Sequence, residues 1–156
     1  MIACTFEDGN PASLRHVVVD TLVFKDDQIL MVKRVVKLLE GGKWGIIGGF
    51  AEHDETLIQA VQREVMEETG WQIRDIKLLA INDHPNRPGE DRQNISFVYV
   101  CQATKKTGEP DWESDEQRWF DLDNLPPRDV IAFDHADYID LYRRYMADKP
   151  ALPMPF

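Results

Sequence analysis

The sequence has little cysteine and no long apolar run. Only Cys4 and Cys101 are cysteines among its 156 residues, and they lie far apart. Two distant thiols cannot form the dense disulfide framework of a small secreted domain, so a reducing, cytoplasmic location is expected. No run of about 18 apolar residues and no charged-then-apolar leader is present, so neither a membrane span nor a signal peptide is predicted.

Basic charge is also scarce. Eighteen Lys and Arg stand against 28 Asp and Glu, which gives a net charge of −10 and a sequence pI of about 4.8. Proteins that bind nucleic acid match its phosphates with clustered Lys and Arg, so no nucleic-acid partner is expected. A free nucleotide would also be repelled unless a bound divalent cation supplied local positive charge.

What is present is the composition of one globular domain, with 43% hydrophobic and 29% charged residues. A chain of this length can bury a core, so residues 1–156 are predicted to form a single domain. Alternating, β-branched segments predict strands, and helical spacing predicts two helices. The expected strands are Val17–Phe24, Ile29–Lys33, Ile73–Asn82, Ile95–Ala103 and Gln117–Phe120, and the expected helices are Glu55–Thr69 and Asp134–Met146.

Two connecting segments carry further signals. Lys25–Gln28, between the first two strands, is typical of a hairpin turn. The proline-rich end, residues 149–156, cannot continue a helix and is expected to be loose or held by a partner. Mixed strands with two helices predict an α/β class, arranged as an α/β/α sandwich.

Three glutamates share one face of the first predicted helix. Glu64, Glu67 and Glu68 stand at i, i+3 and i+4, within an arc of about 100°. Like charges at this spacing oppose helix formation by about 0.2–0.5 kcal/mol per pair. Mg²⁺ prefers carboxylate oxygens and is commonly completed by substrate phosphates, so the pattern indicates a metal and a phosphate. A solvated acidic face is the alternative for the three glutamates taken alone.

The surrounding residues favour the metal. Gly48 and Gly49 supply a tight turn before the helix, Asp54 or Glu55 places an acid near its start, and Gly70 stands where a glycine would end it. Together, residues 49–71 resemble the Nudix box, G-x5-E-x7-R-E-U-x-E-E-x-G-U, in which U is a bulky aliphatic residue. The chain matches it with Gly49, Glu55, the run from Arg63 to Glu68, and Gly70.

The chain departs from the family pattern at two positions. Trp71 replaces the final aliphatic residue, which predicts local repacking without loss of chemistry. Ile47 stands where members often have a proline, and its loop is expected to be more adaptable for that reason. The resemblance covers roughly residues 15–147 and implies the same α/β/α sandwich with a mixed sheet.

The resemblance also implies roles for the box residues. Glu64, Glu67, Glu68 and the carbonyl of Gly48 are the expected ligands of Mg²⁺ or Mn²⁺, with Glu68 the strongest. Arg63 is expected to orient a glutamate, and Glu55 to support the start of the helix.

A general base or extra metal ligand is expected from outside the helix. In family members this acid often precedes a strand with a Trp-Phe pair, and here Glu113 and Glu116 precede Trp119-Phe120. Glu116 is slightly preferred, both as base and as metal ligand, and Glu52 is a weaker third choice. A solvated acidic loop is the alternative for Glu113 and Glu116.

Substrate contacts are expected from loops. Arg87 and Arg92, in the polar loop 83–92, can grip a phosphate or stack on a base, or else pair with Glu90 and Asp91. Other expected substrate contacts are Arg34, the close-approach glycine Gly49, and Phe133 and Asp134, which stand where some relatives read a base; a plain helix N-cap is the alternative for Asp134. The four histidines, His16, His53, His84 and His135, show no metal spacing and are expected at the surface.

The resemblance implies a metal-dependent hydrolase that cleaves a nucleoside diphosphate linked to another moiety. ADP-ribose or a nucleotide sugar is the first expectation for the substrate, and a (d)NTP or oxidised nucleotide is the alternative. A nucleotide-sensing domain that binds without turnover is the alternative from another class, and RNA cap removal lacks a basic surface. Many relatives pair, so a homodimer is left open.

Overall fold

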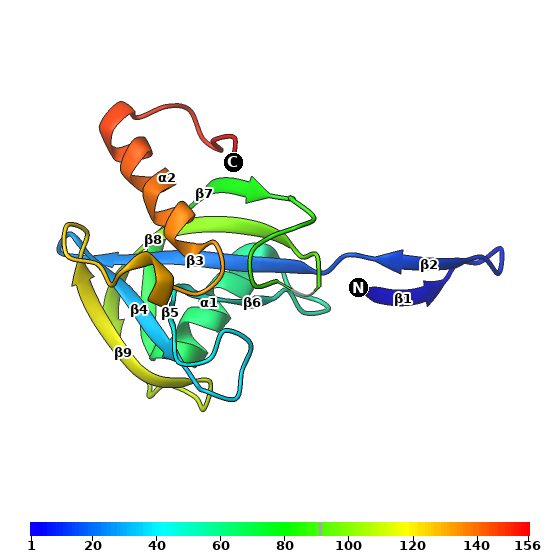
Figure 1. Ribbon diagram of the computed structural model, residues 1–156, viewed down its shortest axis with the longest axis horizontal. Coiled ribbons are helices and arrows are strands. Elements are labelled where there is room, and N and C mark those ends of the chain that lie inside the picture. Colours follow the sequence, from blue (N-terminus) through cyan, green and yellow to red (C-terminus); the bar gives the residue numbers. More distant parts are fainter. Residues whose placement is uncertain (91) are drawn as a thin grey trace.

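The computed structural model of the chain describes residues 1–90 and 92–156 (Figure 1). The described chain contains a small N-terminal hairpin, a larger sheet and two α-helices. The hairpin joins β1 (Ile2–Thr5) to β2 (Pro11–Leu14). The larger sheet comprises β3 (Val17–Lys25), β4 (Gln28–Arg34), β5 (Trp44–Gly45), β6 (Ile47–Phe50), β7 (Trp71–Asn82), β8 (Ile95–Lys106) and β9 (Ser114–Asp121). The helices are α1 (Leu57–Thr69) and α2 (His135–Asp148), and a 3-10 turn, η1 (Arg128–Val130), precedes α2.

The larger sheet is mixed and divides along β3. Its main path runs β5-β4-β3-β8-β7, with β3 and β8 parallel and the other described pairs antiparallel. The first half of β3 pairs with β6, and its second half pairs with β4, which in turn pairs with β9. Asp20 lies opposite Gly48 in the first half. The division leaves an opening beside Asp20, which the functional site uses.

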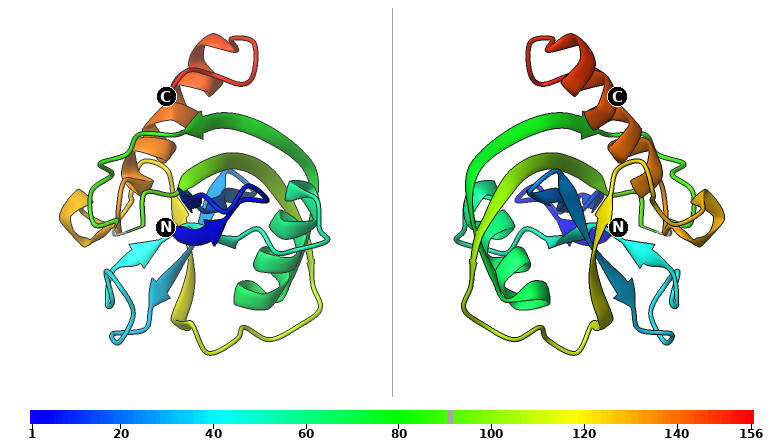
Figure 2. Two further views of the ribbon diagram at one scale, coloured as in Figure 1. Left: turned by 90° about the vertical axis from the view of Figure 1, so that its right-hand side faces the viewer. Right: turned by 90° about the vertical axis from the view of Figure 1, so that its left-hand side faces the viewer.

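The two helices cover opposite faces of this sheet (Figure 2). Leu22 and Phe24 of β3 join the core cluster that contains Tyr138 and Ile139 of α2. Val19 and Val23, which point to the other face because side chains alternate along a strand, join the clusters that contain α1 residues. The predicted α/β/α sandwich is therefore confirmed.

The predicted elements are recovered with shifted ends. The hairpin turn forms with Lys25 opposite Gln28, and Asp26 and Asp27 both adopt positive φ, as a two-residue turn requires. The first helix begins at Leu57, two residues later than predicted, because Thr56 caps it. The strand pair β1–β2 was not predicted, since its four-residue strands are largely exposed and lack a strong apolar alternation.

The C-terminal tail is not loose, in contrast to the expectation. The Met154 N–H donates to the Leu79 carbonyl at 2.7 Å, and the side chains of Leu152 and Met154 pack against the larger core cluster. The Phe156 ring lies 5.1 Å from that of Tyr138. These contacts arise because β7 is an edge strand, whose free backbone groups accept a further segment.

Within the described residues no helix is long and apolar enough to cross a bilayer.

Candidate functional site

Helix α1 holds the three glutamates of the box. Thr56 and Gln59 form a capping box at its start, and Gly70 ends it with a φ of 74° and a hydrogen bond to the Met66 carbonyl. Buried Val61 and Val65 fix its orientation on the sheet. The predicted stop at Gly70 is confirmed, and Thr56 is the residue that caps the start of the helix.

The paired glycines of β6 run close against these glutamates. The Gly48 N–H donates to the Glu68 carboxylate at 3.0 Å. A Cβ added at Gly49 would lie 2.2 Å from Glu64 Oε1, and one at Gly48 would lie 2.3 Å from the Val19 carbonyl oxygen. Both positions therefore require glycine, because a side chain at Gly49 would push β6 away from the helix and one at Gly48 would collide with β3.

The two inner glutamates are difficult to ionise. Burial raises the pKa of Glu68 well above its ordinary value, the Gly48 N–H partly opposes this, and the nearby charges of Glu64 and Glu113 raise it further. Burial also raises the pKa of Glu64, against the opposing effect of Arg63. Glu67 is half exposed. Negative charge is thus crowded at the inner face of the helix.

Arg63 organises the outer side of the cluster. Its guanidinium donates to Glu55 at 2.7 and 3.1 Å, to Glu64 at 2.8 Å, to Glu67 at 3.0 Å and to the Phe50 carbonyl at 3.0 Å. The Arg63 hydrogen bonds lower the pKa of Glu55. This single side chain ties the loop before the helix to two box glutamates.

The acids near β9 occupy different environments. Glu113, just before β9, is close enough to Glu64 and Glu68 to raise the pKa of both. Glu116 lies within β9 opposite Lys33 and forms an ion pair with Arg118. Proximity to Glu64 and Glu68 therefore favours Glu113 over Glu116 as the general base or extra metal ligand, whereas the sequence favoured Glu116. Glu52, the third choice, is exposed, and its N–H donates to Glu55.

The chemistry of this donor set suits a hard divalent cation. Glu64, Glu68 and Glu113 supply only carboxylate oxygens, and the charge of Glu113 raises the pKa of both Glu64 and Glu68, a repulsion that a cation would relieve. No group of three or more His, Cys, Asp or Glu side chains in the described part of the chain is already arranged around one point. Arg63 accounts for part of this, because it holds Glu64 and Glu67.

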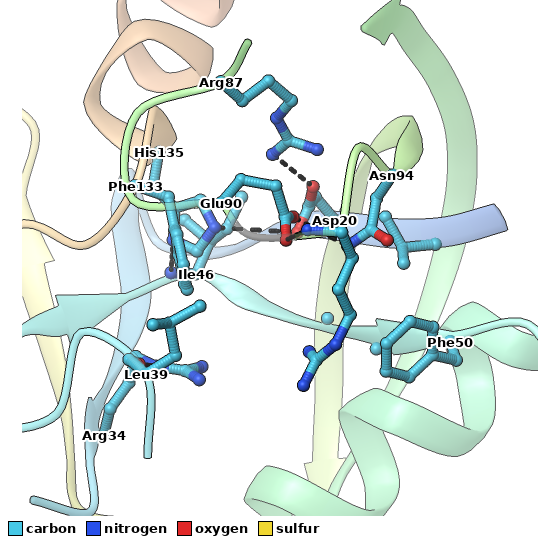
Figure 3. Close-up of a pocket in the computed structure, with 14 residues that line it drawn as sticks. Asp20, Arg34, Leu39, Ile46, Phe50, Arg87, Glu90, Asn94, Phe133 and His135 are labelled. Carbon is cyan, nitrogen blue, oxygen red and sulfur yellow. Dashed lines mark hydrogen bonds and ion pairs between the residues drawn. The ribbon is translucent and has the colours of Figure 1, made fainter. Parts of the chain in front are cut away.

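A pocket opens beside Gly48 and Gly49, on the side of the sheet that α2 covers (Figure 3). Aromatic and charged side chains contribute most of its wall. The lining residues include Asp20, Arg34, Phe50, Arg87, Arg92, Asn94, Phe133 and His135. Since both glycines line it, the pocket is continuous with the glutamate cluster.

Arg87 does not have the partners that the sequence suggested. Its guanidinium is buried and donates twice to Asp134, at 2.8 Å each, and Nη2 lies 3.6 Å from Asp20. Asp134 is at the N-cap position of α2 but makes no side-chain cap hydrogen bond; it also accepts a hydrogen bond from Asn82. Asp134 therefore anchors Arg87 and is neither a helix cap nor a pocket-lining group. Asp91, the other expected partner, lies outside the described residues.

The other predicted substrate residues lie at the pocket. Arg34 donates to the Leu39 carbonyl at 3.0 Å, and its guanidinium lies 5.1 Å from the centre of the Phe133 ring. The guanidinium of Arg92 lies 5.6 Å from the centre of the Phe50 ring. Arg34, Arg92, Phe133 and Gly49 are thus brought together around one opening.

Asp20, His135 and Asn94 are pocket residues that were not singled out as site residues from the sequence. Asp20 is buried and accepts a hydrogen bond from Ser96. His135 is also buried, which corrects the expectation of a surface histidine; its Nδ1 accepts from the Ile46 N–H at 3.1 Å, and its Nε2 lies 3.7 Å from Asp20. A usable signal existed for Asp20, which is the one acid within the apolar strand Val17–Phe24.

The two departures from the box pattern have structural explanations. Ile47 is fully buried and pairs with Thr21, so the segment before the glycines is a regular strand rather than the adaptable loop expected. Trp71 packs edge-on against Trp119, with ring centres 5.5 Å apart, beneath Lys25. The local repacking expected at Trp71 stays a prediction.

Comparison with known proteins gives consistent results. An ADP-ribose pyrophosphatase of Methanocaldococcus jannaschii is 35% identical over 83% of this chain and 73% of its own length. The structure resembles a NUDIX hydrolase from Nitrosomonas europaea, with a TM-score of 0.73 and 24% identity over 99% of this chain and 90% of the other. It also resembles a Francisella tularensis NMN adenylyltransferase/ADP ribose pyrophosphatase complexed with AMP and a Mn ion, with a TM-score of 0.61 and 26% identity over 85% and 43% of the two chains.

Several other curated relatives are much longer, and the chain spans less than half of their length. The NUDIX domain profile matches residues 14–142, which is most of the sequence. The intact box on α1, the sandwich fold and this match agree, and the chain belongs to the NUDIX family.

Proposed function

We propose that this protein is a Mg²⁺- or Mn²⁺-dependent hydrolase of a phosphoanhydride bond in a nucleoside diphosphate linked to another moiety. ADP-ribose or a nucleotide sugar is the favoured substrate. The observation that carries the proposal is the crowding of Glu64, Glu68 and Glu113, of which the first two contact the glycines that line a pocket with aromatic side chains. The M. jannaschii relative named as an ADP-ribose pyrophosphatase supports this choice of substrate.

The metal ligands proposed are Glu64, Glu67, Glu68 and the Gly48 carbonyl. These residues would hold a divalent cation, which when bound would supply positive charge against the diphosphate and lower the pKa of a bound water. The relative that contains Mn, and the all-oxygen donor set, support this assignment. Glu116 is kept only as an alternative ligand, because Arg118 already pairs with it.

The remaining steps belong to side chains of this chain. Glu113 is proposed as the general base, since its exposed carboxylate stands beside the cluster and can accept a proton from the attacking water. Arg63 binds both Glu55 and Glu64, and so fixes the loop before α1 relative to the helix. Arg34 is proposed to bind a phosphate, because no carboxylate in the described part of the chain forms an ion pair with it.

The second candidate function is pyrophosphohydrolysis of a (d)NTP or an oxidised nucleotide. Acids before the Trp119-Phe120 pair favour it, as the sequence indicated. A nucleotide-sensing domain without turnover is the third reading. The complete set of box glutamates argues for hydrolysis.

One experiment separates these functions. The purified protein is incubated with Mg²⁺ and a panel of ADP-ribose, nucleotide sugars, (d)NTPs and oxidised (d)NTPs, and products are identified by mass. AMP with a sugar phosphate supports the favoured function, and release of inorganic pyrophosphate supports the second candidate. Saturable binding without any product supports the sensor.

Location and assembly are also proposals. Both cysteines are free thiols, which supports a reducing compartment such as the cytoplasm. A homodimer stays a prediction, and light scattering at two protein concentrations checks it. No nucleic-acid or membrane partner is proposed, in keeping with the acidic charge balance.

A further inference from the structure

The end of the pocket formed by Arg87 and Asn94 contains two polar atoms that have no partner in the described part of the chain. Arg87 Nη1 and Asn94 Oδ1 are buried, and neither has a hydrogen-bond partner among the described residues. Both residues line the pocket. A buried polar group without a partner is unusual and costly, so each atom calls for an explanation.

The hydrogen-bond network fixes the character of each atom. Asn94 Nδ2 donates to Glu90 at 2.7 Å, which identifies Oδ1 as the unused acceptor. Arg87 uses Nε and Nη2 on Asp134, so Nη1 is its unused donor. The pocket therefore presents one donor and one acceptor at this end.

The charges of the side chains at this end of the pocket do not suit a phosphate group. The guanidinium of Arg87 already faces two carboxylates, Asp134 and Asp20. His135 adds no positive charge, because burial lowers the pKa of its ring. A phosphate would meet more negative than positive charge, so the phosphate role that the sequence suggested for Arg87 does not fit.

The walls favour a flat ligand. Phe133 lies on one side of the pocket and Phe50 on the other, while Arg87, Asp20 and Asn94 converge between them (Figure 3). Aromatic walls bind the faces of a planar ring, and the donor and acceptor then pair with its edge.

We infer that Arg87 and Asn94 together read the edge of an uncharged planar heterocycle, a nucleobase, through Nη1 as donor and Oδ1 as acceptor. Asp134 is a positioning residue, which holds Arg87 so that Nη1 faces the pocket. The substrate then lies with its base at Arg87 and Asn94 and its diphosphate at Gly48, Gly49 and Arg34. The inference rests on the proposed function only in taking this pocket as the substrate site.

The test uses probes that separate base from phosphate. Binding of adenosine, guanosine, cytidine and uridine, and of D-ribose as the sugar alone, is measured by NMR titration without metal. Binding of inorganic pyrophosphate is measured with Mg²⁺. Asn94→Ala is the main variant, Arg87→Lys is the second, and Asn124→Ala, at an exposed turn residue outside this pocket, is the matched control.

We expect at least one nucleoside to bind, and Asn94→Ala to weaken it about tenfold, the effect of one lost hydrogen bond of about 1.4 kcal/mol. Pyrophosphate binding should change less than about twofold in that variant, and Asn124→Ala should change neither, on the same scale. Arg87→Lys keeps the charge but lacks the planar fork, so it should also weaken the nucleoside selectively. Circular dichroism of each variant confirms folding.

Three results would overturn the inference. They are the absence of nucleoside binding, equal nucleoside binding by wild type and Asn94→Ala, and selective loss of pyrophosphate or D-ribose binding. These outcomes are separate from those of the hydrolysis panel. A protein that binds nucleosides through Asn94 but cleaves nothing would retain the inference and lose the proposed hydrolase function.

Discussion

The backbone N–H of Gly48 donates to the carboxylate of Glu68 at 3.0 Å, and so links strand β6 to helix α1. The bond joins the glycine segment to the glutamate that is most deeply buried of the three. Burial and neighbouring acids oppose ionisation of Glu68, while this N–H favours it. Glu68 is therefore the side chain whose state should respond most to a bound cation.

The first prediction concerns Glu68→Gln and stability. The folded pKa of Glu68 is raised above its ordinary value of 4.5. At a pH between the ordinary and the folded pKa, the metal-free folded chain therefore keeps a proton on Glu68 that the unfolded chain has released. Stability from this group is present below about pH 4.5 and is lost as pH rises through the folded pKa. Glutamine stays neutral and can still accept from Gly48. The metal-free variant should therefore melt at a higher temperature than wild type at pH 8.

Adding Mg²⁺ provides the matched comparison. Mg²⁺ should raise the melting temperature of the wild type, because binding to the folded state stabilises it, and should leave Glu68→Gln nearly unchanged. The kcat of the variant should fall by several orders of magnitude. A variant that remains active and is stabilised by Mg²⁺ would remove Glu68 from the metal site.

The second prediction concerns Arg63→Lys. Lysine keeps the positive charge but cannot form the fork that joins Glu55, Glu64 and the Phe50 carbonyl. We expect a loss of about 1–3 kcal/mol in the free energy of unfolding, as for broken hydrogen bonds to charged groups.

The kcat/KM for the best substrate of the panel should fall with the loss of glutamate positioning in Arg63→Lys. Arg74→Lys is the control, because Arg74 is exposed and its Nε makes only a long ion pair of 3.6 Å with Asp75 Oδ2. Urea unfolding and steady-state kinetics check both variants. Equal behaviour of the two would show that the Arg63 fork contributes little.

The sequence predicts the box, the sandwich and the order of the main elements because these depend on local patterns. Glycine spacing, apolar periodicity and helix signals all lie within short windows. The role of Arg87 could not be predicted in this way. Its partner Asp134 is 47 positions away, and only the fold brings them together. The burial of His135 likewise depends on the approach of Ile46 from a distant strand.

The third prediction separates Glu113 from Glu116. Glu113 affects the pKa of Glu64 and Glu68, whereas Glu116 pairs with Arg118. Glu113→Gln should lower kcat by about 10²–10⁴, the usual contribution of a general base, and flatten the acidic limb of the pH–rate profile. Glu116→Gln should change kcat by less than about tenfold, on the same scale. The opposite order would return the role to Glu116.

The fourth prediction concerns Asp134→Asn. Asparagine keeps the shape of the side chain but removes the closer of the two carboxylates that face the buried guanidinium of Arg87. Breaking one side of a buried ion pair costs about 3–5 kcal/mol. Asp137→Asn is the matched control on the same helix, since Asp137 is half exposed and pairs with Arg128 at the surface. Its cost should stay below about 1 kcal/mol. Equal unfolding midpoints in urea for the two variants would contradict the anchoring role of Asp134.

The last prediction is the pH dependence contributed by His135. Burial lowers the pKa of this ring below its ordinary value of 6.5, so the folded chain binds fewer protons than the unfolded chain just below that pH. The stability from a neutral His135 is complete above pH 6.5 and is lost as pH falls through the window beneath it, at up to about 1.4 kcal/mol per pH unit.

His135→Asn can still accept from the Ile46 N–H but does not titrate. The stability of the wild type should therefore fall more steeply between pH 7 and pH 5 than that of His135→Asn. Contributions from other groups, including Glu68, are common to both proteins and cancel in this difference. His53→Gln, at an exposed position, should follow the wild type. Parallel curves for wild type and His135→Asn would mean that the buried ring titrates alike in the folded and unfolded chains.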